Sequence, residues 1–322
     1  MKSNLTAAEI ATQLNKAKVV AIFCHVRPDG DALGSALSLK NALENAGKTA
    51  YAICEDAPPQ KYLFIEGVNE MLTEIPQGVN FDTFVTVDSA DKSRLGKFEI
   101  DYLRFKGNKI NIDHHISNDR YGDYNFVYEC PATCQLLPEI FSAAKLEINE
   151  KIANLLAFGL ITDSGNFTHQ DVDEKTFTVA AKLKAKGANV NRLNYYLFQN
   201  QSKTRALLYG RVMNKMRFAL EDKLVFITTT LADRNELGAT IAMTEGFVDF
   251  PLTIDGIEVC ASILQMNANQ YKVSLRSKGK VNVNAVASQF GGGGHILASG
   301  CTLFGEYEEV IERITYAVYQ NL

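Results

Sequence analysis

Short apolar runs alternate with amphipathic segments along the first half of the chain. Residues 19–24 form a continuous β-branched-rich run, followed by a Pro/Asp/Gly turn and then by helical spacing over 32–46. This order is typical of a β-turn-α unit. Further buried strands are predicted over 49–54, 84–87 and 109–112, and further helices over 131–144, 149–161 and 173–186. We therefore expect an α/β domain with a mostly parallel sheet flanked by helices.

The pattern changes after residue 201. A helical pattern over 203–216 leads into strand-like runs, and residues 267–270 resemble a hairpin connection. These runs cover residues 224–230, 259–264 and 271–275. We therefore expect a smaller C-terminal mixed α+β domain. The predicted domains are 1–190 and 206–322, joined by a helical linker over 191–205, and the cleft between domains is a usual place for a ligand.

The composition excludes several classes of protein. Of the 322 residues, 46% are hydrophobic and 22% are charged, which is typical of a globular chain and not of a disordered one. The 33 basic and 37 acidic residues give a net charge of −4, which argues against a protein that coats long nucleic acid. Six cysteines without a C-x-x-C pair predict reduced thiols in the cytoplasm. No signal peptide or spanning apolar run is seen, so we expect no membrane association.

Acidic residues and histidines gather where predicted strands and one predicted helix end. The residues are His25, Asp29, Asp31, Asp88, Asp113, His114, His115 and Asp163. In an open α/β sheet, ligands bind beyond the carboxyl ends of the strands, so we expect these side chains to converge. Several crowded carboxylates need positive charge among them, which a pair of divalent ions about 3.5–4 Å apart would supply. Oxygen and imidazole donors suit Mn²⁺, with Mg²⁺, Co²⁺ or Fe²⁺ as substitutes, and predict hydrolysis of a phosphoester.

Single pieces of this pattern also have structural interpretations. Asp29-Gly30-Asp31 is an ordinary polar turn when taken alone, and Asp88 could cap a following helix. Adjacent imidazoles beside a carboxylate have no common structural use. Cys24 precedes His25 but lies inside an apolar run, so we interpret it as a buried small hydrophobe and not as a nucleophile.

A second cluster lies in the predicted C-terminal domain. Arg276 and Ser277 follow a strand-like run, and four glycines at 291–294 precede His295. Glycine backbone and an arginine fork fit a phosphate cradle, whereas glycines alone are more typical of a flexible surface loop. A Walker A loop is excluded because no Gly-Lys-Ser/Thr follows.

Together these motifs resemble the DHH phosphoesterase family. His-x-x-x-Asp-x-Asp over 25–31 with Ala-Leu-Gly-Ser, the strand-end Asp, Asp-His-His and Thr-Asp-Ser-Gly appear in the family's order. The Gly-Gly-Gly-Gly-His segment resembles the DHH-associated C-terminal domain. The likeness spans nearly the whole chain and points to the stand-alone NrnA-type members. Ser164 stands where family members often carry Thr.

The resemblance implies roles for individual residues. The metal ligands it implies are His25, Asp29 and Asp88 for one Mn²⁺, and Asp31, Asp88, His114 and Asp163 for the other. Asp88 would bridge the ions, Asp113 would orient a histidine, and His115 would face the scissile phosphate. The implied substrate contacts are Arg276, Ser277, Gly293, Gly294 and His295, with Asn166 and Arg94 as further contacts.

The resemblance also implies an activity. We expect a Mn-dependent phosphodiesterase and phosphatase that hydrolyses very short oligoribonucleotides to nucleoside 5′-monophosphates and 3′-phosphoadenosine 5′-phosphate (pAp) to AMP. Alternatives are a pApA or cyclic di-AMP phosphodiesterase, a manganese pyrophosphatase, and a non-catalytic nucleotide sensor. The glycine-rich segment disfavours the pyrophosphatase, and the complete ligand set disfavours the sensor. The expected partners are short single-stranded RNA or small nucleotides, and the sequence leaves a homodimer open.

Overall fold

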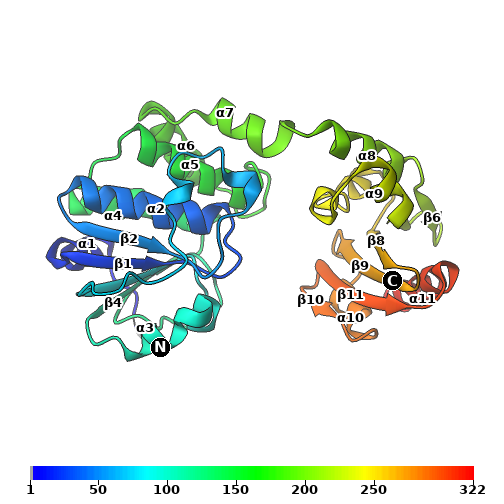
Figure 1. Ribbon diagram of the computed structural model, residues 1–322, viewed down its shortest axis with the longest axis horizontal. Helices are drawn as coiled ribbons and strands as arrows, with labels where there is room; N and C mark the ends of the chain where they lie inside the picture. The colour runs from blue at the N-terminus through cyan, green and yellow to red at the C-terminus, as the bar shows by residue number, and fades with distance from the viewer. Residues whose placement is uncertain (1–2) are drawn as a thin grey trace. The chain divides into compact units, whose positions relative to one another are not determined.

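The computed structural model describes residues 3–322. The chain forms two compact units, of which the first ends at Asn200 and the second begins at Gln201 (Figure 1). Among the described residues, no helix is both long enough and apolar enough to cross a membrane.

The first unit contains a five-stranded sheet in which all neighbouring strands are parallel, in the order β2-β1-β3-β4-β5. The strands are β1 (Val19–Phe23), β2 (Thr49–Ile53), β3 (Thr83–Val87), β4 (Asn108–Asp113) and β5 (Tyr124–Val127). From β1 the chain first adds β2 on one side and then β3 on the other. The loops after β1 and β3 therefore diverge, and such a switch point is where open α/β sheets bind ligands.

Helices cover both faces of this sheet (Figure 1). One face shares a core with α1 (Ala7–Lys16), α2 (Gly30–Asn45), α4 (Thr133–Ala144) and α5 (Glu150–Asp163). The other face packs against the 3₁₀ segment Lys92–Phe98 and α3 (Glu99–Arg104). The remaining helices are the 3₁₀ turns Gln60–Tyr62 and Val68–Glu70, then α6 (Glu174–Ala185), α7 (Val190–Asn194) and the π-helix η4 (Tyr195–Gln199). The predicted parallel α/β architecture is confirmed, while α1 and β5 are additional to the predicted elements.

Helices α2 and α5 pack closely because glycines lie at their contact. A Cβ on Gly34 of α2 would lie 2.6 Å from the Leu155 carbonyl oxygen of α5. A Cβ on Gly159 of α5 would lie 2.8 Å from an Asp31 carboxylate oxygen. Larger side chains would push the helices apart. The close packing brings the first turn of α2 next to the last turn of α5.

The second unit contains a six-stranded mixed sheet in the order β10-β11-β9-β8-β7-β6, in which only β7 and β8 are parallel. Its strands are β6 (Arg217–Ala219), β7 (Leu224–Thr229), β8 (Val259–Asn267), β9 (Gln270–Ser277), β10 (Gly293–Gly294) and β11 (Ala298–Phe304). The predicted mixed α+β character is therefore confirmed.

Helices also cover both faces of the second sheet. Helices α10 (Val283–Ser288) and α11 (Tyr307–Tyr319) share one core with it. The opposite core is built with α8 (Lys203–Met213), α9 (Leu231–Leu237) and the segment that carries the 3₁₀ turns Ile241–Thr244 and Phe250–Thr253.

Candidate metal centre

Acidic and imidazole side chains from four segments of the first unit form one cluster. In each of three groups, the possible ligand atoms lie within 4.8 Å of one another. The groups are Asp88, His114 and His115; His25, Asp29 and Asp88; and Asp31, His114 and Asp163. Asp88 and His114 each belong to two groups, so the three groups are parts of a single centre.

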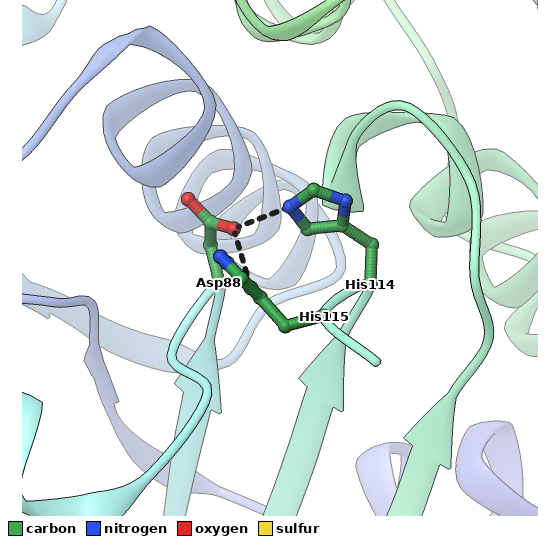
Figure 2. A group of neighbouring side chains, drawn as sticks. All are labelled: Asp88, His114 and His115. Atoms are coloured by element: carbon green, nitrogen blue, oxygen red, sulfur yellow. Dashed lines mark ion pairs between the residues drawn. The ribbon is translucent and has the colours of Figure 1, made fainter. Parts of the chain in front are cut away.

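Asp88 lies in the middle of this centre, directly after β3. Its Oδ2 lies 3.5 Å from His25 Nε2, and its Oδ1 lies 3.3 Å from His114 Nε2. Figure 2 shows both His114 and His115 directed at the same Asp88 carboxylate. Asp88 also has a left-handed backbone, with φ 52°, which is uncommon for a residue other than glycine. Each carboxylate oxygen thus faces a different imidazole, as a ligand shared by two ions would require.

Backbone carbonyls hold the imidazoles of the buried His25 and the partly buried His114 in one orientation. His25 Nδ1 lies 2.8 Å from the Val26 oxygen, and His114 Nδ1 lies 2.7 Å from the Cys130 oxygen. A carbonyl oxygen can only accept, so Nδ1 carries a proton in each ring. Nε2 therefore lies on the side of the carboxylates, and once a cation replaces its proton it can donate a lone pair, which is the usual arrangement of metal-binding histidines.

Without a metal ion, the centre retains protons. Burial lowers the pKa of His25, but hydrogen bonds and charge from Asp29 and Asp88 outweigh it and raise the pKa to about 10. Burial likewise opposes protonation of His114, yet Asp88 and neighbouring carboxylates raise its pKa to about 11. Burial and the charge of Asp88 raise the pKa of Asp163 to about 7. The centre therefore requires positive charge, which divalent cations would supply in place of protons.

Helix N-termini hold two of the carboxylates. Asp29 caps α2, since its Oδ1 accepts from the Asp31 and Ala32 N–H groups at 3.1 and 3.0 Å. Its Oδ2 lies 3.4 Å from His25 Nε2. Asp31 is fully buried and accepts from the Thr133 and Cys134 N–H groups at 2.6 and 2.9 Å, at the start of α4. The sequence analysis did not predict these N–H donors of α4. The helix predicted over 131–144 could have indicated them, because the first N–H groups of a helix have no partner within it.

Asp113 and His115 form a hydrogen-bonded pair beside the centre. Asp113 is fully buried at the end of β4, and its Oδ1 lies 2.9 Å from His115 Nδ1. Asn118 donates from Nδ2 to the other Asp113 oxygen at 2.6 Å. Asn118 is a further supporting residue that the motifs did not reveal. Asp113 therefore holds His115 at Nδ1, while 30% of the His115 side chain stays exposed.

The other predicted contacts of the first unit lie beside the same loops. The Arg94 carbonyl oxygen accepts from the Val26 N–H at 2.8 Å, next to the loop that carries His25. Asn166 follows Asp163 by three residues, and its Oδ1 accepts from Asn194 Nδ2 at 2.8 Å. Ser164 is buried, and its hydroxyl oxygen accepts from the Phe167 N–H at 3.0 Å.

The predicted substrate contacts of the second unit lie on β9, β10 and the turn after β10. Arg276 Nε lies 3.5 Å from an Asp249 carboxylate oxygen. Ser277 is buried and donates to Glu258 Oε1 at 3.1 Å, so its hydroxyl already has a partner. Gly293 and Gly294 pair with β11, and the exposed His295 begins the turn. The glycine run is therefore partly a paired strand and not a free loop.

The donor set suits a hard or borderline cation. Carboxylate oxygens and imidazole nitrogens make up all three groups, and no cysteine belongs to any of them.

Comparison with known proteins agrees with this chemistry. Residues 19–160 match the DHH family, N-terminal domain, and residues 222–321 match the DHHA1 domain. The bifunctional oligoribonuclease and PAP phosphatase NrnA of Thermus thermophilus is 33% identical over 309 residues, which cover 94% of this chain and 90% of that protein. The chain belongs to the DHH family. It is a metal-dependent phosphoesterase of that family.

Two further proteins are similar to this chain. The cyclic-di-AMP phosphodiesterase PdeA of Listeria monocytogenes is 26% identical over 306 residues, which cover 89% of this chain and 45% of that protein. The crystal structure of an exopolyphosphatase-related protein from Bacteroides fragilis superposes with a TM-score of 0.87 at 25% identity, covering 98% of this chain and 96% of that one.

Proposed function

We propose that this DHH phosphoesterase uses Mn²⁺ to hydrolyse very short oligoribonucleotides to nucleoside 5′-monophosphates, and pAp to AMP. The observation that carries the proposal is the shared Asp88, whose two oxygens face His25 and His114 at 3.5 and 3.3 Å. The likeness to the Thermus NrnA over 90% of that protein's length supports the choice of substrates.

The donor groups divide between two ions as follows. His25, Asp29 and Asp88 would hold one, and Asp31, Asp88, His114 and Asp163 the other. Bound there, the ions would supply a hydroxide at neutral pH and would neutralise the charge that develops on the phosphoryl oxygens. The carbonyl partners of His25 and His114 keep both rings in the ligating tautomer.

Hydrolysis adds a water oxygen to phosphorus and breaks the P–O bond to the leaving ribose oxygen, which must gain a proton. In our proposal His115 serves this phosphate, either by stabilising its charge or by protonating the leaving oxygen. Asp113 accepts from the ring at 2.9 Å and thereby orients it. A positioned acid of this kind contributes about 10²–10⁴-fold in rate.

The second unit would hold the nucleotide. Arg276 offers a planar fork suited to phosphate, and its partner Asp249 is itself exposed, so the fork is available to exchange that partner for a phosphate. We assign the backbone of Gly293 and Gly294 and the exposed His295 to the same task. Small residues there let a phosphate approach the chain closely.

A second candidate function is hydrolysis of pApA or cyclic di-AMP. The likeness to the Listeria PdeA favours it, although this chain matches 45% of that protein. The same metal centre would serve either reaction, because both break a phosphodiester between nucleosides. Only the substrate differs.

Initial rates on a panel of substrates test the proposal. The full-length protein with Mn²⁺ is given pAp, RNAs graded from two to several nucleotides, pApA and cyclic di-AMP, and Asp88→Asn serves as the inactive control. We expect the highest kcat/KM on the shortest RNAs, together with phosphate release from pAp. A higher kcat/KM on cyclic di-AMP, or on pApA than on dinucleotides of other base sequence, would favour the second candidate, and hydrolysis of none of these would refute both.

A further inference from the structure

A small pocket with aromatic walls lies in the first unit. Its volume is about 180 Å³, well below the roughly 300–1,000 Å³ of sites for drug-sized ligands. It is formed by the 3₁₀ turn Gln60–Tyr62, the end of α5 and the π-helix η4. Its lining residues are Lys61, Tyr62, Thr162, Tyr196, Leu197 and Phe198. No residue of the metal centre lines it, so it is a separate feature.

One wall of this pocket lies next to the metal centre. Thr162 lines the pocket and directly precedes Asp163. The Thr162 side chain packs against Gly30, where an added Cβ would lie 2.7 Å from Thr162 Cγ2. Gly30 stands between Asp29 and Asp31. The pocket therefore lies one residue layer away from the carboxylates that would hold the ions.

The aromatic ring of Phe198 is partly exposed and, in the described part of the chain, is not stacked on another ring. Its side chain is 44% exposed, and within residues 3–322 no paired ring lies against it. Tyr196, by contrast, is stacked on Phe64 with centroids 4.8 Å apart and forms a fixed wall. Both aromatics lie in η4, where the Asn200 N–H donates to the Tyr195 oxygen at 2.7 Å. Such π-turns are rare and occur frequently at functional sites.

We propose that this pocket binds a nucleobase of the RNA substrate, stacked on Phe198, on one side of the scissile phosphodiester. The inference rests on the proposed function and adds a subsite to it. Stacking on an aromatic ring accepts every base, which suits an enzyme that degrades short RNA of any sequence. Lys61, whose Nζ lies 5.0 Å from the Tyr62 ring centroid, adds positive charge to the lining of the pocket.

The pocket distinguishes RNA from pAp. A dinucleotide carries a base on each side of the scissile phosphate, whereas pAp carries one base in total. The single base of pAp would be held with the nucleotide gripped by the second unit. Loss of stacking is therefore expected to affect a dinucleotide more than pAp, mainly through KM.

The test compares kcat and KM of the full-length Mn²⁺ enzyme on an RNA dinucleotide and on pAp. For Phe198→Ala, the ratio of kcat/KM on dinucleotide to that on pAp should fall by about fivefold or more, since one stacked base contributes about 1–3 kcal/mol. Phe198→Leu keeps apolar bulk without a π face and should show the same fall. Phe198→Tyr should keep the wild-type ratio. Phe304→Ala, a 64% exposed Phe on β11, is the matched control and should also keep it.

Two results separate this inference from the function on which it rests. A wild-type enzyme that hydrolyses neither substrate contradicts the proposed function. A wild-type enzyme active on both, whose ratio is unchanged in Phe198→Ala or falls equally in Phe304→Ala, overturns the subsite alone. A fall in Phe198→Ala that Phe198→Leu fully restores also overturns it, because apolar bulk rather than stacking would then be responsible. Circular dichroism of each variant confirms that it is folded.

Discussion

Replacing Gly34 by Ala tests whether the close packing of α2 and α5 holds the metal centre together. The added Cβ would lie 2.6 Å from the Leu155 carbonyl oxygen, about 0.8 Å short of the 3.4 Å at which ordinary contacts begin. The obstructing atom belongs to the backbone of α5, so no side chain can rotate away. The two helices must separate, and α5 carries Asp163 while α2 carries Asp31.

Two opposing contributions set the size of the effect on stability. Alanine in a helix interior is more favourable than glycine by about 0.5–1 kcal/mol. Overpacking of a close-packed core costs about 1–3 kcal/mol, and contact with backbone places this site at the upper end. We therefore expect Gly34→Ala to lower the free energy of unfolding by about 2–2.5 kcal/mol. A misplacement of catalytic groups by about 1 Å can also cost about 100-fold in rate, so kcat should fall more than stability suggests.

Urea unfolding and phosphate release from pAp measure the two effects. Gly210→Ala is the matched control, because Gly210 lies within α8, is exposed and has no atom within 4 Å of an added Cβ. This control should gain about 0.5–1 kcal/mol and keep full activity. If Gly34→Ala were as stable and as active as Gly210→Ala, the helix packing would not position the centre.

Three further predictions concern the centre itself. Asp88→Asn preserves shape but removes the shared anion, so activity should be abolished and titration should detect fewer bound Mn²⁺ ions; retention of both ions would contradict a bridging role. Asn118→Ala should lower kcat about 10–100-fold with little change in KM, because Asp113 loses the hydrogen bond that holds its carboxylate against His115. An unchanged kcat would show that Asn118 does not help to position His115. Mn²⁺ must displace the proton of His114, because the pKa of this histidine is raised to about 11, so the apparent affinity for Mn²⁺ should rise with pH across the neutral range. Calorimetry in buffers of different ionisation enthalpy should detect the released proton, and Mn²⁺ binding that is independent of pH would refute this prediction.

Much of the fold follows from local pattern alone. The runs over 19–24 and 84–87 are apolar on both faces, which suits strands covered by helices on each side, and the structure has β1 and β3 there. Helix α1 has apolar residues on one face and a capping box formed by Thr6 and Glu9, yet it was not predicted. It precedes the first strand, so the alternation of strands and helices that predicts the other elements does not include it.

The limits of sequence reasoning show most clearly around Asp31 and Asp113. Their presence in motifs was visible, but the partners that hold them were not. Asp31 accepts from N–H groups about a hundred residues away, and Asp113 depends on the amide of Asn118. Backbone N–H groups exist at every helix start, so composition cannot mark the one that meets a buried carboxylate.

The amino-acid sequence by itself determined which metal-binding groups this phosphoesterase contains. It also determined the strand ends at which they lie, because the strands can be located from local hydrophobic periodicity. Only the tertiary structure decided that the two oxygens of Asp88 face different imidazoles, that glycines bring α2 and α5 into backbone contact, and that Phe198 keeps a free ring beside Thr162. Those properties depend on contacts between segments far apart in the chain, where packing within tenths of an ångström selects the arrangement.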